Sequence, residues 1–135
     1  MGRIILTTMT MVYKDDGTFL VQNRVKNDWP GLNFPGGHVE ENESIEDSAI
    51  REIEEETGLK ISELENVGSF EWNLLDKKER HLCILFRTNK FEGELKSSKE
   101  GNVFFIKKEE VPNYPLSTDF DKLLEIMLKG LNLSI

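Results

Sequence analysis

The chain has 135 residues, 38% of them hydrophobic and 31% charged, a balance typical of a globular protein and not of a disordered or fibrous one. This length leaves no room for a second domain of ordinary size, so one domain over residues 1–135 is expected. No apolar run approaches the roughly 20 residues that a membrane helix needs, and the N-terminus fits neither a signal peptide nor a myristoylation site. We therefore expect a cytoplasmic protein with no membrane partner.

The net charge of −8 is concentrated in one short segment. Residues 37–59 contain nine acids and one base, whereas the remainder of the chain contains 16 of each. A remainder with balanced charge lacks the basic stripe that nucleic-acid binding requires, so no stable nucleic-acid partner is expected. The acidic segment indicates a cation site, without establishing one.

The first third of the chain is dominated by strand-forming residues. Residues 3–14 and 18–24 flank the turn sequence Asp15-Asp16-Gly17, which predicts a hairpin. Residues 26–31 are expected to form a loop that carries Trp29 and Pro30. A short extended piece over 32–34 should then end at a glycine turn, Pro35-Gly36-Gly37.

The second half of the chain alternates strand and turn signals before a final helix. Strands are expected over 67–75 and 80–88, joined by a polar turn at 76–79, and over 103–106. Apolar residues with helical spacing predict a last helix from about 118 or 119 to 129. The single cysteine, Cys83, lies in an apolar run, so we interpret it as a small buried hydrophobe and not as a nucleophile.

The acidic segment itself reads as a helix from Ser44 to Thr57. Ser44 begins a sequence of the capping-box type, and Gly58 has the position of a C-terminal cap. At 100° per residue, Ile45, Ala49 and Ile53 define the stripe that should face the core. Three glutamates border that stripe: Glu52, Glu55 and Glu56.

Three carboxylates at this spacing repel one another, so a positive charge should offset them. Oxygen ligands suit Mg²⁺ or Mn²⁺, which can bridge carboxylates to substrate phosphates and activate a water molecule. The alternative is a solvated acidic helix with no ligand. The core-facing position of the glutamates and the adjoining glycines, which let a ligand approach the backbone, weaken that alternative.

The same residues have the spacing of a known motif. From Gly37 the sequence runs through five residues to Glu43, then through seven residues to Arg51-Glu52-Ile53-Glu54-Glu55-Glu56-Thr57-Gly58-Leu59. This resembles the Nudix box at all nine of its specified positions. The segment from Trp29 to Gly37 is also similar to the approach to that box, and Glu100 precedes a strand as an additional metal-binding Glu does in MutT-type members.

The resemblance implies a fold and a set of roles. The fold would be an α/β/α sandwich with a mixed central β-sheet, and the chemistry would be metal-dependent hydrolysis of a nucleoside diphosphate linked to another group. Arg51 would hold Glu52, which is our first choice for the general base, with Glu56 as the second. The expected ligands of the Mg²⁺ or Mn²⁺ ion are the carbonyl of Gly36, Glu52, Glu55, Glu56 and Glu100.

Within the family the chain is most similar to MutT and to the oxidised purine nucleoside triphosphatases. Asn33 and Asp119 match positions that contact the purine in such enzymes. The expected substrate-binding residues are Arg24, Trp29, Asn33, Phe34, Gly37 and Asp119. Several have structural alternatives: Phe34 as core, Asp119 as a helix N-cap, Asn33 as a turn residue and Trp29 as a loop anchor.

The expected reaction is hydrolysis of a nucleoside triphosphate, such as 8-oxo-dGTP, to the monophosphate and pyrophosphate. ADP-ribose or another nucleoside diphosphate derivative is the alternative substrate. A catalytically silent nucleotide-binding regulator is the alternative class, although such a protein should have lost a carboxylate of the box. The preferred base, the attacked phosphorus, the metal, and the choice between monomer and homodimer are left open.

Overall fold

A computed structural model describes residues 2–25 and 29–131. Strands dominate this part of the chain, and two α-helices accompany them. In chain order the elements are β1 (Arg3–Val12), β2 (Phe19–Arg24), β3 (Gly31–Asn33), β4 (Gly36–His38), α1 (Ile45–Thr57), β5 (Lys60–Ile61), β6 (Glu65–Leu74), the 3₁₀ helix η1 (Leu75–Lys77), β7 (Glu79–Thr88), β8 (Phe91–Glu92), β9 (Gly101–Ile106), the 3₁₀ helix η2 (Lys108–Asn113) and α2 (Phe120–Leu128).

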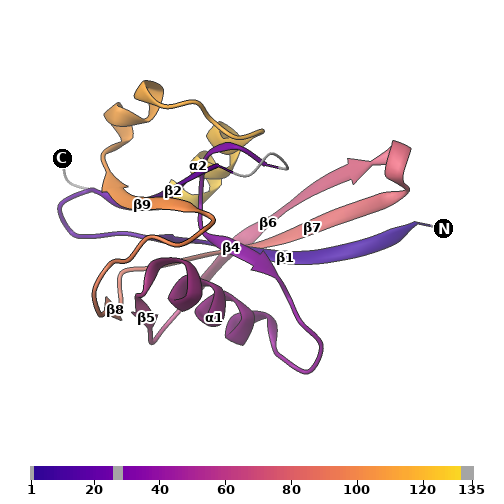
Figure 1. Cartoon of the computed structure of the whole chain (residues 1–135), viewed down its shortest axis with the longest axis horizontal. Helices are drawn as coiled ribbons and strands as arrows, with labels where there is room; N and C mark the ends of the chain where they lie inside the picture. Colours follow the sequence, from indigo (N-terminus) through magenta and orange to yellow (C-terminus); the bar gives the residue numbers. More distant parts are fainter. Residues whose placement is uncertain (1, 26–28, 132–135) are drawn as a thin grey trace.

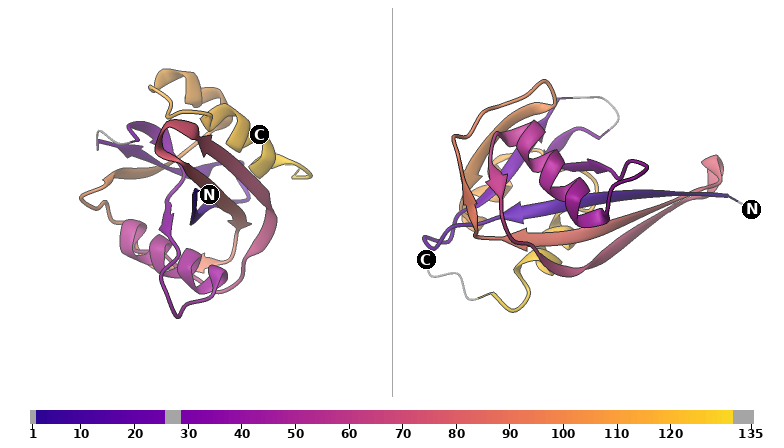
Figure 2. Two further views of the ribbon diagram at one scale, coloured as in Figure 1. Left: turned by 90° about the vertical axis from the view of Figure 1, so that its right-hand side faces the viewer. Right: turned by 90° about the horizontal axis from the view of Figure 1, so that it is seen from below.

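The largest sheet is mixed. Its strand order is β4-β1-β7-β6, in which β1 runs parallel to β7 and the two outer strands are antiparallel to their neighbours. A second, antiparallel sheet has the order β3-β2-β9, and β5 pairs with β8 separately. In Figure 1 and in the left view of Figure 2, α1 and α2 lie on opposite sides of the strands. The expected α/β architecture with a mixed sheet is therefore confirmed.

Each helix covers its own hydrophobic cluster. Neighbouring residues of β1 illustrate the division, because successive side chains of a strand point to opposite faces. Met11 belongs to the cluster that includes Phe120 and Leu123 of α2, and Val12 belongs to the cluster that includes Ile53 of α1. The two clusters hold the helices against the sheets and so fix the rotation of each helix.

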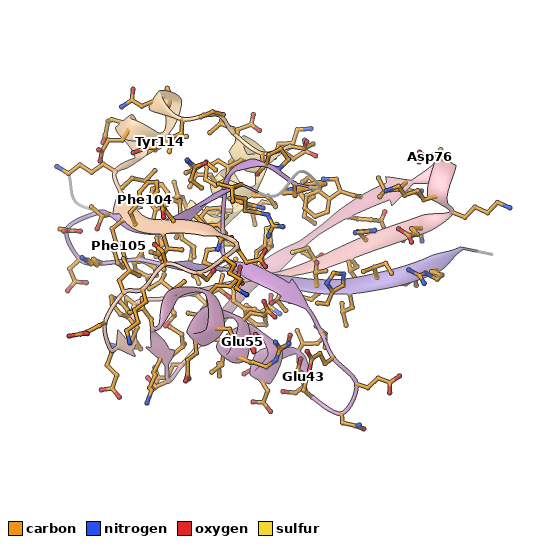
Figure 3. The ribbon with its side chains drawn as sticks, viewed as in Figure 1. Glu43, Glu55, Asp76, Phe104, Phe105 and Tyr114 are labelled. Carbon is orange, nitrogen blue, oxygen red and sulfur yellow. The ribbon has the colours of Figure 1, made fainter. Side chains whose placement is uncertain are left out.

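The hairpin of β6 and β7 projects beyond both helices together with the start of β1 (Figures 1 and 2). Asp76 marks its tip in Figure 3, and the neighbouring Leu75 is 80% exposed. The expected turn at 76–79 contains the end of η1, followed by Lys78 with a positive φ of 53°. Closer to the helices, the same strands form one wall of the cleft described below. No helix in the described ranges is long and apolar enough to cross a membrane.

Two expectations about local structure are wrong. Strands β1 and β2 do not form the predicted hairpin, because β1 pairs with β4 and β7 while β2 joins the other sheet. A single antiparallel bridge, Tyr13 to Phe19, connects the two ends. Gly36 and Gly37 do not form a turn either, since both lie in β4 and pair with Met9 and Thr8 of β1.

The remaining elements match the sequence to different degrees. The short strands β5 and β8 and the helix η2 were not expected. Of the predicted loop at 26–31, residues 26–28 lie outside the described residues, and Gly31 begins β3. Cys83 is fully buried, as expected, and burial raises the pKa of its thiol to about 11.

Candidate active site

Helix α1 is capped at both ends by the residues that the sequence indicated, Ser44 and Gly58. The Ser44 hydroxyl accepts a hydrogen bond from the Asp47 amide at 3.0 Å, and Gly58 has a left-handed φ of 81° with its N–H donating to Glu54. Ala49 and Ile53 are fully buried, and they fix the rotation of the helix about its axis. With that rotation Glu56 lies inside the protein and Glu52 is partly covered, while Glu54 points to solvent.

Two carboxylates meet beside β4. Glu56 is only 5% exposed, and its Oε2 accepts a hydrogen bond from the backbone N–H of Gly36 at 3.0 Å. Burial raises the pKa of Glu56 well above its ordinary value. The side-chain hydrogen bond with Glu52 and the negative charge of Glu52 raise it further. A buried pair of like charges is stabilised by a cation, so this point of the molecule favours one.

Glycine is required at position 36 because the backbone of β1 approaches it closely. A Cβ atom at Gly36 would collide with the carbonyl oxygen of Thr8, whereas one at Gly37 would displace the carboxylate of Glu52. The sequence predicted a close approach at these glycines but placed it in a turn. The structure instead places it on an edge strand of the sheet.

Arg51 connects the acidic residues on the exposed side of the helix. Its guanidinium contacts both carboxylate oxygens of Glu43, at 3.0 and 2.7 Å, and holds the pKa of Glu43 at about 2. The same group donates to Glu52 at 2.7 Å, to Glu55 at 3.1 Å and to the carbonyl of His38 at 3.1 Å. The expected contact between Arg51 and Glu52 is present, and Glu43 joins the loop to the helix through Arg51.

Glu52, Glu55 and Glu56 border a cleft of about 830 Å³. Figure 3 labels Glu55 on α1 and Glu43 in the segment that precedes the helix. The lining combines an acidic set, Glu40, Glu52, Glu55, Glu56 and Glu100, with an aromatic set, Trp29, Phe34 and Trp72. Such a cleft has donors suited to a metal ion and flat apolar walls suited to a ring.

Most of the predicted site residues line this cleft, but some already have partners. Arg24 donates to the carbonyl of Trp29 at 3.1 Å and lies 3.6 Å from Glu100. Asn33 is buried, and its side-chain oxygen accepts from the N–H of Phe34. Phe34 is 2% exposed and stacks on Phe120 at 4.9 Å between ring centroids, which matches the core position given as the alternative to substrate binding; its substrate role stays a prediction.

Asp119 is not among the residues that line the cleft. It precedes α2 with a positive φ of 65°, and its side chain makes no capping hydrogen bond, so it has the N-cap position without the usual N-cap interaction. Its Oδ2 instead accepts from the indole N–H of Trp72 at 2.8 Å, and its Oδ1 lies 3.5 Å from the Lys122 ammonium. The Asp119 carboxylate therefore orients Trp72, which lines the cleft, without lining the cleft itself.

Trp72 is the main site residue that sequence reasoning missed. It lies on β6, lines the cleft, and meets Trp29 edge-to-face at 5.4 Å. The alternation of Phe70, Trp72 and Leu74 in the predicted strand carried a signal, because residues two apart share a face. The face could not be assigned to a cleft without knowing what covers it. Lys77, His81 and Lys99 also line the cleft and were not singled out.

The predicted metal ligands lie on one side of the cleft without forming a closed metal site. Among the residues that the structure describes, no three His, Cys, Asp or Glu side chains converge tightly enough to hold an ion as they stand. Arg51 accounts for part of this, since it draws Glu52 and Glu55 toward itself. The donor chemistry nevertheless fits a hard divalent ion: adjacent carboxylates, one of them buried, beside an edge strand.

Comparison with known proteins places the chain in a family. The NUDIX domain model matches residues 5–125, so the chain belongs to the Nudix family and is a Nudix hydrolase. Members of this family generally use divalent metal ions such as Mg²⁺.

Named relatives show that the chain is MutT-like. It is 30% identical over 128 residues to the ADP-ribose pyrophosphatase of Methanocaldococcus jannaschii, covering 90% of this chain and 72% of the relative. It is 30% identical over 91 residues to the 8-oxo-dGTP diphosphatase of Proteus vulgaris, covering 64% and 76%. The crystal structure of the MutT protein from Bacillus halodurans superposes with a TM-score of 0.79 at 27% identity, covering 96% of this chain and 85% of the other.

Proposed function

We propose that this Nudix hydrolase cleaves a nucleoside triphosphate, such as 8-oxo-dGTP, to the monophosphate and pyrophosphate with the help of Mg²⁺ or Mn²⁺. The observation that carries the proposal is the pair Glu52 and Glu56, which meets at the wall of a cleft that also presents aromatic side chains. The carboxylates suit a metal ion that binds phosphates, and the aromatic walls suit a nucleobase.

In the proposed mechanism Glu52, Glu55, Glu56 and the carbonyl of Gly36 would hold the ion, and Glu100 would be a further ligand. A bound divalent ion supplies charge neutralisation at the phosphates and lowers the pKa of the attacking water. Glu52 accepts the proton of that water while its oxygen bonds to an inner phosphorus and the bond to the leaving pyrophosphate breaks. Glu56 is the second candidate for this base. Arg51 positions Glu52 through the 2.7 Å contact.

The base would lie among the aromatic residues of the cleft. Trp29 and Trp72 stand nearly perpendicular, at 79°, so a planar ring can stack on one indole and contact the other. Asn33 lines the same cleft. Asp119 accepts a hydrogen bond from Trp72, so it can contact the base directly only if that hydrogen bond breaks; otherwise it influences the base by orienting Trp72. Among the cationic side chains that line the cleft, Arg24 and Lys99 are our candidates for contact with the phosphates.

A second substrate has a specific observation in its favour. The relative named as an ADP-ribose pyrophosphatase matches at the same identity as the 8-oxo-dGTP diphosphatase and over a longer stretch. ADP-ribose or another nucleoside diphosphate derivative is therefore the second candidate. A catalytically silent regulator is disfavoured, because every carboxylate of the box is present.

A substrate panel tests the proposal. The purified protein is incubated with Mg²⁺ and 8-oxo-dGTP, dGTP, dATP, CTP, ADP-ribose or a dinucleoside polyphosphate, and products are separated by ion-exchange chromatography. We expect a triphosphate, led by the oxidised guanine nucleotide, to give monophosphate and pyrophosphate. Faster hydrolysis of ADP-ribose or of the dinucleoside polyphosphate than of any triphosphate would overturn the substrate assignment.

Matched variants of α1 test the site. Glu52→Gln and Glu56→Gln should each lower kcat by about 10²-fold to 10⁴-fold, the usual contribution of a positioned acid or base. Glu54→Gln is the control, since Glu54 belongs to the same helix but is exposed. Equal activity of all three variants would contradict the assignment. A cytoplasmic location and a single domain over residues 1–135 stay predictions.

A further inference from the structure

The surface that α1 covers changes from apolar to polar directly beneath the two carboxylates. Val12 of β1 and Leu20 of β2 pack with Ile53 in one hydrophobic cluster. Residues two apart on a strand share a face, so Thr10 continues the face of Val12, and Gln22 continues that of Leu20. The polar continuation is unusual, because a helix covers this face and the aliphatic pattern of the strands stops there.

The strand register places these polar residues beside Glu52 and Glu56. Thr8 pairs with Gly37, and paired residues of antiparallel strands point to the same face. The Glu52 carboxylate occupies the space on the Cβ side of Gly37, so Thr8 faces the same region as Glu52. On the other strand the Gln22 side chain approaches Glu56 and opposes the rise in its pKa.

The polar groups are buried without ordinary partners. Thr10 and Gln22 have no exposed surface and Thr8 is 1% exposed. Within the described ranges, neither hydroxyl and neither amide atom of Gln22 reaches full hydrogen-bonding geometry with any other group. Buried polar atoms without partners destabilise a fold, so stability does not explain their presence here.

We propose that Gln22 is a positioning residue, whose amide holds the carboxylate of Glu56 in the orientation that binds the divalent ion, supported by the hydroxyls of Thr8 and Thr10. The inference rests on the proposed metal site at Glu52 and Glu56. Gly36 already donates its N–H to Oε2 of Glu56, which restrains that carboxylate from the side of β4. An amide from β2 restrains it from a second side, and groups that orient a metal ligand in this way control the affinity for the metal.

The test measures Mn²⁺ binding without nucleotide, so it does not depend on turnover. Free Mn²⁺ is followed by electron paramagnetic resonance during titration of wild type, Gln22→Met and Leu20→Met. Gln22→Met keeps the length of the side chain and removes the amide, and we expect Mn²⁺ affinity to fall by about 10-fold to 100-fold. Leu20→Met, on the same face of β2 but in the apolar part, should leave the affinity within about twofold, as expected of a volume-conserving exchange.

The stability of the same variants separates positioning from structure. Gln22→Met removes buried polar atoms that make no hydrogen bond of full geometry, so its thermal midpoint without metal should equal or exceed that of wild type. Unchanged Mn²⁺ affinity in Gln22→Met, with or without a lower midpoint, overturns the proposal. Should Gln22→Met not fold, Gln22→Asn takes its place, because it withdraws the same amide by one methylene and is expected to weaken Mn²⁺ binding.

Failure of the proposed function would look different. If wild type binds Mn²⁺ more tightly than Gln22→Met does but hydrolyses no nucleotide, the enzymatic assignment fails and the positioning role of Gln22 is supported. Glu56→Gln serves as the reference for loss of a ligand. If this variant binds Mn²⁺ as tightly as wild type, Glu56 is not a ligand and the role of Gln22 is overturned, whatever the enzyme hydrolyses.

Discussion

Arg51 shows how one side chain serves both the fold and the chemistry. Its planar guanidinium has donors in fixed directions, and it uses them on Glu43, Glu52 and Glu55 together. The contact with Glu43 ties the loop before α1 to the helix, while the contact with Glu52 fixes a carboxylate at the cleft. A lysine would preserve the charge but could not reach these acids in the same directions.

Replacement of Arg51 by Lys should therefore lower kcat more than it changes KM. We expect a fall of about 10-fold or more, because a misplaced general base costs rate even when the substrate still binds. The measurement is steady-state kinetics on the best nucleotide of the panel. Arg80→Lys is the control, since Arg80 pairs with Glu71 on the exposed part of the projecting hairpin. Equal kcat values in the two variants would contradict the positioning role of Arg51.

The contact between Trp72 and Asp119 sets a second residue-scale expectation. Trp72→Phe keeps an aromatic ring against Trp29 and removes the N–H that Asp119 accepts. If the nucleobase binds here, KM should rise by about 5-fold to 10-fold with little change in kcat, since one hydrogen bond contributes about 1 kcal/mol. Trp29→Phe is the matched control, because the indole N–H of Trp29 has no partner among the described residues. Equal KM values in the two variants would assign no role to the Asp119 contact.

At the scale of elements, helix α1 could be predicted because its signals are local. Ser44, the buried positions Ala49 and Ile53, and Gly58 lie within one stretch of 15 residues, and each is where the sequence placed it. The prediction of a hairpin between β1 and β2 was wrong because β1 pairs instead with a strand that is distant in the sequence. The parallel partner of β1 is β7, about 75 residues later, and that pairing was not visible in the turn sequence.

The site divides in the same way. The box glutamates and Arg51 were found because their spacing on a single helix is a sequence property. The Trp72 to Asp119 contact spans 47 residues and joins β6 to the start of α2, so no spacing rule could have found it. The role inferred for Gln22 also depends on the packing of α1 across β2, which the sequence pattern alone did not show.

The C-terminal cap of α1 can be tested against a second glycine. A side chain at Gly58 would require the left-handed φ of 81° and would also press its Cβ to 2.6 Å from the carbonyl of Glu94. Gly130 has a similar φ of 80°, but a Cβ atom there would make only an ordinary contact, 3.9 Å from the Arg87 guanidinium. Gly130→Ala should lower the free energy of unfolding by about 1 kcal/mol, and Gly58→Ala by more, because the collision adds to the backbone strain.

Urea denaturation followed by tryptophan fluorescence gives both values. The difference between the two variants isolates the collision, since the backbone conformation is nearly the same at both glycines. A loss at Gly58 equal to or smaller than that at Gly130 would mean that the loop carrying Glu94 yields to the added methyl group.

At the scale of the whole molecule, the cleft exists only because three separate parts of the fold meet. Helix α1 and β4 supply the carboxylates and the glycines, the segment at Trp29 to Phe34 supplies one aromatic wall, and the projecting strands supply Trp72. These parts are held by two different hydrophobic clusters, one under each helix. Metal binding at the carboxylates should therefore stabilise the assembled molecule and not only the helix.

This coupling gives an expectation for metal removal. A ligand that binds the folded state alone adds about 2.7 kcal/mol to the free energy of unfolding at a concentration 100 times its Kd. Mn²⁺ or Mg²⁺ should raise the thermal midpoint of wild type, and EDTA should reverse the change. In the metal-free protein, Glu56→Gln should be more stable than wild type, because the Glu56 carboxyl must take up a proton or bury its charge on folding, and the amide of Gln does neither.

The interpretation requires two opposite differences between Glu56→Gln and wild type, one in the thermal midpoint without metal and one in the increase that metal causes. Glu56→Gln should exceed wild type in thermal midpoint without metal and respond to metal far less, whereas Glu54→Gln should respond as wild type does. Scanning calorimetry at several Mn²⁺ concentrations measures both. A variant Glu56→Gln that is less stable than wild type without metal would mean that the fold itself needs the carboxyl group, through its hydrogen bond with Gly36. Burial of Glu56 would then not be a cost to stability that a bound cation offsets.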